Sequence, residues 1–167
     1  VAEANVSRDI LLDLDHDVPV SVLVMDPPVV LGLDLAAIAE ITDQPVEFVV
    51  NTHWHGDHVG GNEPMAKTGA VIVAHDNVRV RMAAEGPRQS PPGALPVITF
   101  SDTTTFHMNG HEIHVFHPGH AHTDGDAVIH FRNLDLIHAG DLFFNGQYPF
   151  IDVASGGSVK GYLAAMN

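Results

Sequence analysis

The twelve residues 51–62, NTHWHGDHVGGN, crowd four possible metal ligands into six positions: His53, His55, Asp57 and His58. The segment just before them, PVEFVV at residues 45–50, is a short apolar run typical of a buried strand. The ligands therefore follow the C-terminal end of a strand, where α/β layers usually place their sites. Two histidines at positions i and i+2 can converge on one ion, and this donor set suits zinc, with manganese, iron and cobalt compatible.

A second histidine cluster follows in HPGHAHTDGDAVIH, and it offers three candidates for a further ligand: His117, His120 and His122. Asp141, in HAGDLFF, comes after the next pair of apolar segments. A site made of His53, His55 and one later histidine leaves one coordination position for water. That open position distinguishes a catalytic zinc site from a structural one.

Composition narrows the chemistry further. The chain has no cysteine, so thiolate ligands, cysteine nucleophiles and disulfides are excluded and any metal must be held by nitrogen and oxygen. Seven Lys and Arg residues stand against 21 Asp and Glu residues, and the resulting net charge of −14 repels phosphate backbones and anionic membrane surfaces. We therefore expect a small-molecule substrate, with neither nucleic acid nor a membrane as a partner.

The 167 residues are expected to form a single domain. The first half alternates predicted strands and helices, at residues 19–25, 34–42, 45–50, 71–74 and 76–85. Residues 87–96 carry four prolines and predict an irregular connection. From residue 97 onward the pattern changes to strands, and the Asn109-Gly110 pair predicts a hairpin turn. This order predicts an α/β fold in which a β-meander completes sheets covered by helices.

The motifs HWHGDH, AHTDGD and HAGDLFF together resemble those of the metallo-β-lactamase superfamily, over about residues 20–165. The resemblance implies an αββα sandwich. It also implies a first zinc held by His53, His55 and His122, a second held by Asp57 and His58, and a bridging Asp141. Either one or two ions would be bound.

The resemblance also separates the ligands from their neighbours. It favours His122 over His120 because a His-Thr pair precedes the turn into the next strand, and it makes His120 a candidate for supporting a ligand or for exposure to solvent. Asp26 lies where the family often has an aspartate that supports a histidine ligand. The family's usual Thr-Gly after that aspartate is replaced here by Pro27 and Pro28, which departs from the pattern.

Family members of this type continue beyond the point where this sequence stops, through a helix, a strand and a last histidine motif. The resemblance therefore predicts a single metallo-β-lactamase-like domain over residues 1–167 that is incomplete at its C-terminus. We expect weak occupancy of the second metal position, or completion of the fold by another chain in a homo-oligomer.

The function implied is a zinc-dependent hydrolase, in which metal-activated water attacks the carbonyl of a β-lactam, lactone, ester or thioester and Asp57 orients the water or moves a proton. Asp141 in place of cysteine argues against lactamases that use a cysteine at the second metal. The alternatives are a fragment that binds metal without catalysis, and an iron or manganese redox member of the superfamily. The bacterial periplasm, secretion and the cytoplasm all remain compatible compartments.

Overall fold

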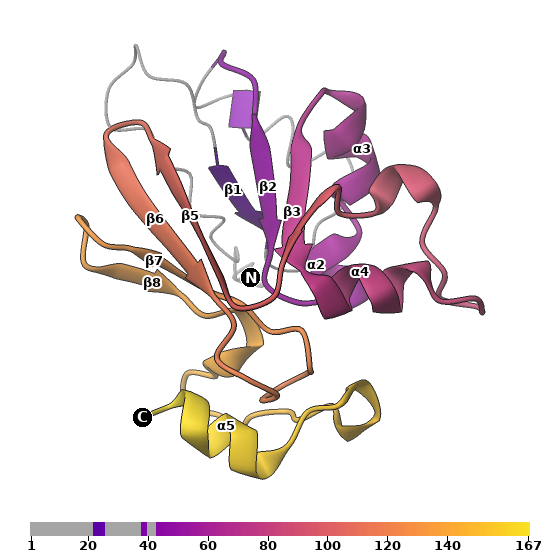
Figure 1. The fold of residues 1–167 in the computed structure, drawn as a ribbon, viewed down its shortest axis with the longest axis vertical. Helices are drawn as coiled ribbons and strands as arrows, with labels where there is room; N and C mark the ends of the chain where they lie inside the picture. The colour runs from indigo at the N-terminus through magenta and orange to yellow at the C-terminus, as the bar shows by residue number, and fades with distance from the viewer. Residues whose placement is uncertain (1–21, 26–37, 40–42) are drawn as a thin grey trace, which may run out of the picture.

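The computed structural model describes residues 22–25, 38–39 and 43–167. In this part of the chain two four-stranded sheets lie face to face (Figure 1). The first sheet is parallel and contains, in order, β1 (Val22–Met25), β2 (Phe48–Asn51), β3 (Val71–His75) and β4 (Ile98–Phe100). The second is an antiparallel meander of β5 (Thr103–Met108), β6 (His111–Phe116), β7 (Val128–Phe131) and β8 (Leu136–His138).

Helices cover the outer side of the first sheet, as Figure 1 shows for α3 (Asn62–Lys67) and α4 (Asp76–Ala83). A short α2 (Gly56–Val59) follows β2, and α5 (Val159–Ala165) lies near the C-terminal end of the chain. Single 3-10 turns occur at Pro92–Ala94, Gly140–Leu142 and Val153–Ser155. Among the described residues, no helix has the length and apolar character that a bilayer crossing requires.

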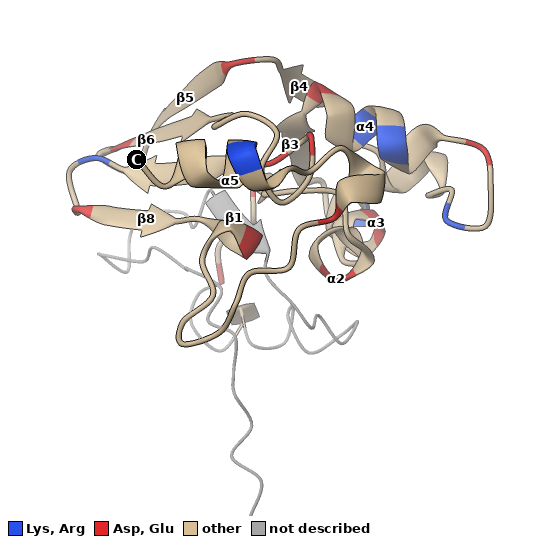
Figure 2. Ribbon diagram, turned by 90° about the horizontal axis from the view of Figure 1, so that it is seen from below, with Lys and Arg blue, Asp and Glu red and all other residues tan. Residues whose placement is uncertain are grey.

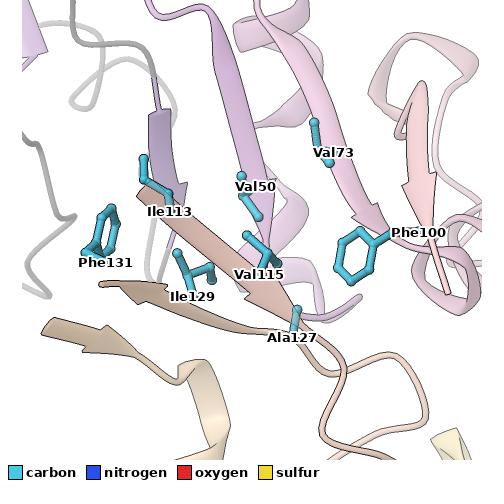
Figure 3. Packing of buried hydrophobic residues seen from close by; sticks show 8 residues of the cluster. All are labelled: Val50, Val73, Phe100, Ile113, Val115, Ala127, Ile129 and Phe131. Atoms are coloured by element: carbon cyan, nitrogen blue, oxygen red, sulfur yellow. The ribbon is translucent and has the colours of Figure 1, made fainter. Parts of the chain in front are cut away.

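The main core lies between the two sheets and is formed by alternate residues of their strands. Val50 and Val73 of the first sheet pack with Phe100 against Val115 and Phe131 of the second (Figure 3). Because successive side chains of a strand point to opposite faces, the sequence neighbours of the core residues in the first sheet point outward to the helices.

The outward-facing residues of the first sheet form two further clusters under the helices. Val49 and Ile72 pack with Met65 of α3, and Ala74 packs with Val78 and Met82 of α4. Tyr162 of α5 packs with Val128 of the second sheet, and its hydroxyl donates to the carbonyl of Leu142 at 2.6 Å. Helices therefore flank paired sheets, which confirms the predicted α/β class.

One strand belongs to a different sheet from the one predicted. The sequence from residue 97 onward reads as one meander, but β4 pairs in parallel with β3, with Val73 opposite Ile98. The chain bends at Ser101 and Asp102 before β5 begins the second sheet. Both segments have strand-forming residues, so local pattern alone cannot show that the run divides between sheets.

Other local expectations agree more closely with the structure. Asn109 and Gly110 have φ values of 53° and 72°, as a two-residue hairpin turn of type I′ requires. The helix predicted to reach residue 85 ends at Ala83. Most of the helix predicted at 34–42 lies outside the described residues, as does Asp26, the proposed supporting aspartate.

The packing of Phe131 predicts its contribution to stability. Phe131 is 0% exposed between the sheets, so Phe131→Ala leaves a cavity and is expected to lower the free energy of unfolding by about 3–5 kcal/mol. The matched control is Phe143→Ala, at a position 69% exposed, with an expected loss below about 0.5 kcal/mol. Urea denaturation followed by circular dichroism measures both, and equal losses would contradict the assignment of the core.

Candidate metal centre

Three loops at one end of the facing sheets are held together by backbone hydrogen bonds. Ala127, before β7, donates its N–H to the carbonyl of Thr52, after β2, at 2.7 Å. The loop after β8 joins them, because Asp152 donates to the carbonyl of His122 and Asp124 donates to the carbonyl of Ser155, each at 2.9 Å. Ligands that are far apart in sequence are thereby placed on a common scaffold.

The first of these loops is closed by a pair of buried asparagines. Asn51 and Asn62 exchange side-chain amide hydrogen bonds, each of 2.9 Å, across the base of the loop. Asn62 also donates to the carbonyl of Ala94 at 3.0 Å. Both asparagines are fully buried, so these bonds replace the water that the amides would otherwise bind and fix the two ends of the loop.

The structure gathers four of the predicted residues into one group, with ligand atoms within 4.8 Å of one another: His53, His55, His122 and Asp141. His55 Nδ1 lies 3.0 Å from His53 Nε2 and 3.1 Å from His122 Nε2. The three imidazole rings are nearly perpendicular in pairs, at 85–89°, so that one nitrogen of each faces a common point.

The remaining hydrogen bonds identify which of these nitrogens carry a proton. His55 Nε2 lies 2.9 Å from a carboxylate oxygen of Asp152, and His122 Nδ1 lies 2.7 Å from the carbonyl oxygen of Phe150. Carbonyl and ionised carboxylate oxygens only accept, so in the neutral rings both of these nitrogens carry the hydrogen. His55 Nδ1 and His122 Nε2 therefore face each other as unprotonated lone pairs.

Two facing lone pairs repel each other, and a cation between them turns that repulsion into ligation. Nitrogen atoms about 2.0–2.1 Å from a tetrahedral zinc would lie about 3.3 Å apart, close to the separations of 3.0 and 3.1 Å found here. Burial, followed by the neighbouring His58, His122 and His55, lowers the pKa of His53 well below its usual value. His53 is thus held in the neutral form that a divalent metal needs.

Asp141 is placed between this group and the neighbouring His58. One carboxylate oxygen lies 3.4 Å from His122 Nε2, and the other lies 3.4 Å from His58 Nε2. Burial alone would raise the pKa of Asp141, but the hydrogen bond and charge of His58 and the charges of His122 and His55 lower it. Asp57 lies 3.9 Å from His58 Nε2 and is 51% exposed. This arrangement suits a second ion near Asp57 and His58, with Asp141 between the two ions. The binding of this second ion stays a prediction.

A glycine allows Asp141 to come this close to the first loop. Gly140 has φ +51°, and a Cβ atom there would lie 2.7 Å from the side chain of Thr52. A larger residue would push the chain away from Thr52 and so move Asp141, the next residue, away from the histidines.

The other histidines of the second cluster lie outside the group. His117 Nδ1 donates to the carbonyl of Asp126 at 2.7 Å, and the His117 ring stacks on that of His75 with centroids 4.1 Å apart. His120 is exposed, and its backbone carbonyl accepts a hydrogen bond from Ser158. Of the three candidates His117, His120 and His122, the structure brings His122 alone into the four-residue group.

Sequence reasoning did not identify Asp152, which orients His55 from 97 positions away. Burial works to raise the pKa of Asp152, but hydrogen bonds from Ser155 and His55 outweigh it and lower the pKa to about 2. The carboxylate also accepts the N–H of Ser155 at 3.1 Å and caps the turn that follows. An Asp-x-x-Ser pattern indicates such a cap in a sequence, but it does not reveal the histidine partner.

Arg81 of α4 is a second such support. Its guanidinium makes two hydrogen bonds to the carboxylate of Asp124, at 2.6 and 2.7 Å, in the loop that carries His122. It also lies 5.8 Å from the ring centre of Trp54, which stands between the two ligands of the first loop. Arg81 therefore contacts both histidine loops from outside the group.

Comparison with known proteins agrees with this geometry. The family model described as the metallo-beta-lactamase superfamily matches residues 21–166. The chain belongs to this superfamily. The match spans the three histidine ligand candidates, Asp141, and the supporting residues Asp152 and Arg81.

Two similar curated proteins and one solved structure illustrate the range of the superfamily. A hydroxyacylglutathione hydrolase of Gloeobacter violaceus is 32% identical over 123 residues, covering 74% of this chain and 40% of that protein. The alpha subunit of a 2,4-dinitroanisole O-demethylase of Nocardioides sp. is 30% identical, covering 62% and 31%. A metallo-beta-lactamase from Pontibacter korlensis superimposes with a TM-score of 0.72 at 25% identity, covering 87% and 66%.

The share of each relative that is covered limits how far the relatives' activities can be extended to this chain. The chain spans 40% and 31% of the lengths of those two curated relatives. Their names describe activities of longer proteins. The superfamily and its fold are therefore established for this chain, which carries a histidine and aspartate cluster that could hold a metal ion, whereas its reaction is a matter for proposal.

The role of Asp152 leads to a prediction about metal affinity. Asp152→Ala removes the acceptor that fixes the His55 tautomer, and the zinc affinity is expected to fall about 10- to 100-fold. Asp152→Asn keeps a neutral acceptor and is expected to lie between the wild type and Asp152→Ala. Competition with a chromophoric chelator measures the affinities, with Asp102→Asn at an exposed position as control. Equal affinities for all four proteins would show that Asp152 does not orient the ligand.

Proposed function

We propose that the chain is a metal-dependent hydrolase that acts on the carbonyl group of a small thioester, ester, lactone or β-lactam, with zinc as the metal. The observation that carries the proposal is the pair of unprotonated nitrogens on His55 and His122, 3.1 Å apart and next to the carboxylate of Asp141. This is a site for a cation, and it borders an open cleft rather than a closed core. An accessible metal site favours catalysis over a structural role.

Similar proteins support the choice of an acyl substrate. Curated relatives from several bacteria are named hydroxyacylglutathione hydrolases, at 28–34% identity. An acyl-glutathione is a thioester, so among the four substrate types we place thioesters first. The metallo-beta-lactamase of Pontibacter korlensis keeps β-lactams among the candidates.

A zinc ion held by His53, His55 and His122 would lower the pKa of a water molecule and polarise a substrate carbonyl. The chain's own residues prepare the site for this chemistry. Asp152 and Phe150 keep the metal-facing nitrogens of His55 and His122 free of protons. Asp141 supplies a carboxylate that stays ionised despite its burial, because the neighbouring histidines hold its pKa below the ordinary value.

Asp57 is the residue we assign to proton transfer. It occupies the first turn of α2, it is half exposed, and it lines the cleft next to His55. A carboxylate in this position can hold a water molecule by accepting its hydrogen bond, take up a proton, and return it to the leaving group. His58 is fully buried beside it, with its Nε2 atom 3.9 Å from the Asp57 carboxylate.

A substrate panel tests the proposal. Zinc-loaded protein of verified metal content is assayed with S-lactoylglutathione, 4-nitrophenyl esters, N-acyl homoserine lactones and nitrocefin. We expect turnover of at least one carbonyl substrate, fastest with the thioester. Full metal occupancy without turnover would favour the binding-only hypothesis, and oxygen consumption by an iron- or manganese-loaded sample would favour a redox enzyme.

A variant separates proton transfer from metal binding. Asp57→Asn keeps the shape of the side chain but removes its basicity, so kcat is expected to fall about 100-fold or more while the first metal stays bound. The control is His107→Ala, an exposed histidine on β5, which is expected to change neither quantity. Elemental analysis of each variant accompanies the kinetics. Unchanged kcat in Asp57→Asn would remove Asp57 from the mechanism.

A further inference from the structure

A cleft of about 650 Å³ opens beside the metal-binding group. Its lining combines residues of the first histidine loop, Arg81 of α4, the loop that follows α4 and the loop after β8. The members that matter here are Trp54, His55, Asp57, Arg88, Phe150 and Asp152. A space of this size accommodates a small organic molecule with one end at the metal-binding group.

The acidic side chains in this lining already have partners. Asp152 binds His55 at 2.9 Å and also accepts from the backbone and hydroxyl of Ser155. Asp57 faces His58 and is a predicted metal ligand. The cleft therefore offers a cationic ligand little negative charge that is not already engaged.

Arg88 is the charged lining residue without such a partner. Within the described residues it makes no hydrogen bond or ion pair, and its side chain is exposed at the cleft. Of the other lysines and arginines in the described part of the chain, Arg81 binds Asp124, Lys67 binds Glu63 and Arg132 binds Glu112, while Lys160 on α5 does not line the cleft. Basic positions are few on the ribbon in Figure 2, and some of them lie on α4, directly before the loop that carries Arg88.

The aromatic residues Trp54 and Phe150 give the cleft an apolar surface beside the metal-binding group. The ring of Trp54 lies beside that of His55, with centroids 5.6 Å apart, and the ring of Phe150 lies 5.8 Å from that of His122. The Trp54 Nε1 atom is buried without a hydrogen-bond partner in the described part of the chain. Because its polar nitrogen is buried, Trp54 lines the cleft with the hydrocarbon part of its ring, which suits the carbon chain of a ligand.

We propose that this cleft recognises a carboxylate on the substrate, with Arg88 as the residue that binds it and Trp54 as the surface for the intervening carbon chain. This inference rests on the hydrolase function proposed above and narrows its substrates to acyl compounds that carry a second, anionic group. A guanidinium binds a carboxylate through two parallel N–H donors, which gives direction as well as attraction. The reacting carbonyl then lies at the metal end and the carboxylate at the Arg88 end.

The single tryptophan of the chain provides a binding assay that needs no turnover. Trp54 lines the cleft, so its fluorescence reports on occupancy. Glutarate, a dicarboxylate, is titrated into the zinc-loaded protein and compared with glutaramide, its neutral analogue. We expect a saturable change with glutarate, at least about 10-fold weaker binding of glutaramide, and a similar loss of glutarate binding in Arg88→Ala.

Two further variants make this assay decisive. Arg88→Lys keeps the charge but not the paired donors, so intermediate affinity is expected, whereas Arg132→Ala removes an arginine from the distant β7–β8 turn and should bind glutarate as the wild type does. Equal glutarate affinity in Arg88→Ala and wild type would mean that the metal holds the carboxylate, and would overturn the proposal. So would equal binding of glutarate and glutaramide, or no saturable binding.

Kinetics distinguish failure of this inference from failure of the hydrolase proposal. For the 4-nitrophenyl monoester of glutaric acid, Arg88→Ala is expected to raise KM about 10-fold or more with little change in kcat, while KM for the neutral 4-nitrophenyl butyrate stays constant. If the wild type hydrolyses both esters and Arg88→Ala has the same two KM values, the role of Arg88 is wrong and the hydrolase stands. If glutarate binds through Arg88 but no substrate turns over, the hydrolase is wrong and the carboxylate site stands.

Discussion

The site depends on how two imidazole rings are turned. His55 donates through Nε2 to Asp152, and His122 donates through Nδ1 to the carbonyl of Phe150. The other nitrogens of the two rings, His55 Nδ1 and His122 Nε2, therefore lie 3.1 Å apart without a proton between them. If either ring took the other tautomer, the two would join in an ordinary hydrogen bond and the cation site would be lost. Both acceptors belong to the loop after β8, so this short loop fixes the protonation pattern of ligands carried by two other loops.

The fold serves the site by bringing one end of each sheet to the same place. The first loop leaves the C-terminal end of β2, His122 precedes β7, and Asp141 follows β8. Packing of Val50 and Val73 against Val115 and Phe131 sets the distance between the sheets, and the ligands lie just beyond that packed layer. Arg81 then joins the loops from outside, through Asp124 and Trp54. Site geometry is thus a consequence of core packing, and a metal bound there stabilises the folded state in turn.

Much of this could be predicted from the sequence, because the informative residues are close together. Spacing alone predicts a metal site from His53, His55, Asp57 and His58, and the apolar run before them places this site at a strand end. The position of β4 could not be predicted, because residues on both sides of Ser101 favour strands and the division between sheets is decided by pairing with β3. The roles of Asp152 and of the Asn51 and Asn62 pair could not be predicted either, because they depend on partners that only the folded chain brings within reach. Sequence pattern reveals ligands, whereas the groups that orient them are defined by tertiary contact.

Net charge alone would suggest that this chain avoids anions, since −14 creates a repulsive field around it. That field is screened over about 8–10 Å at physiological salt, so it acts on approach more than on binding. Inside the cleft the balance is set by the nearest groups instead. Asp152 has a pKa of about 2 and is held by His55 and Ser155, so its charge is shared with close donors. Arg88 is the charge left without a partner among the described lining residues, and a bound metal would add further positive charge beside the cleft. A strongly acidic protein can therefore contain a site selective for an anionic ligand, because contact pairs, and not the overall charge, determine which ligand is held.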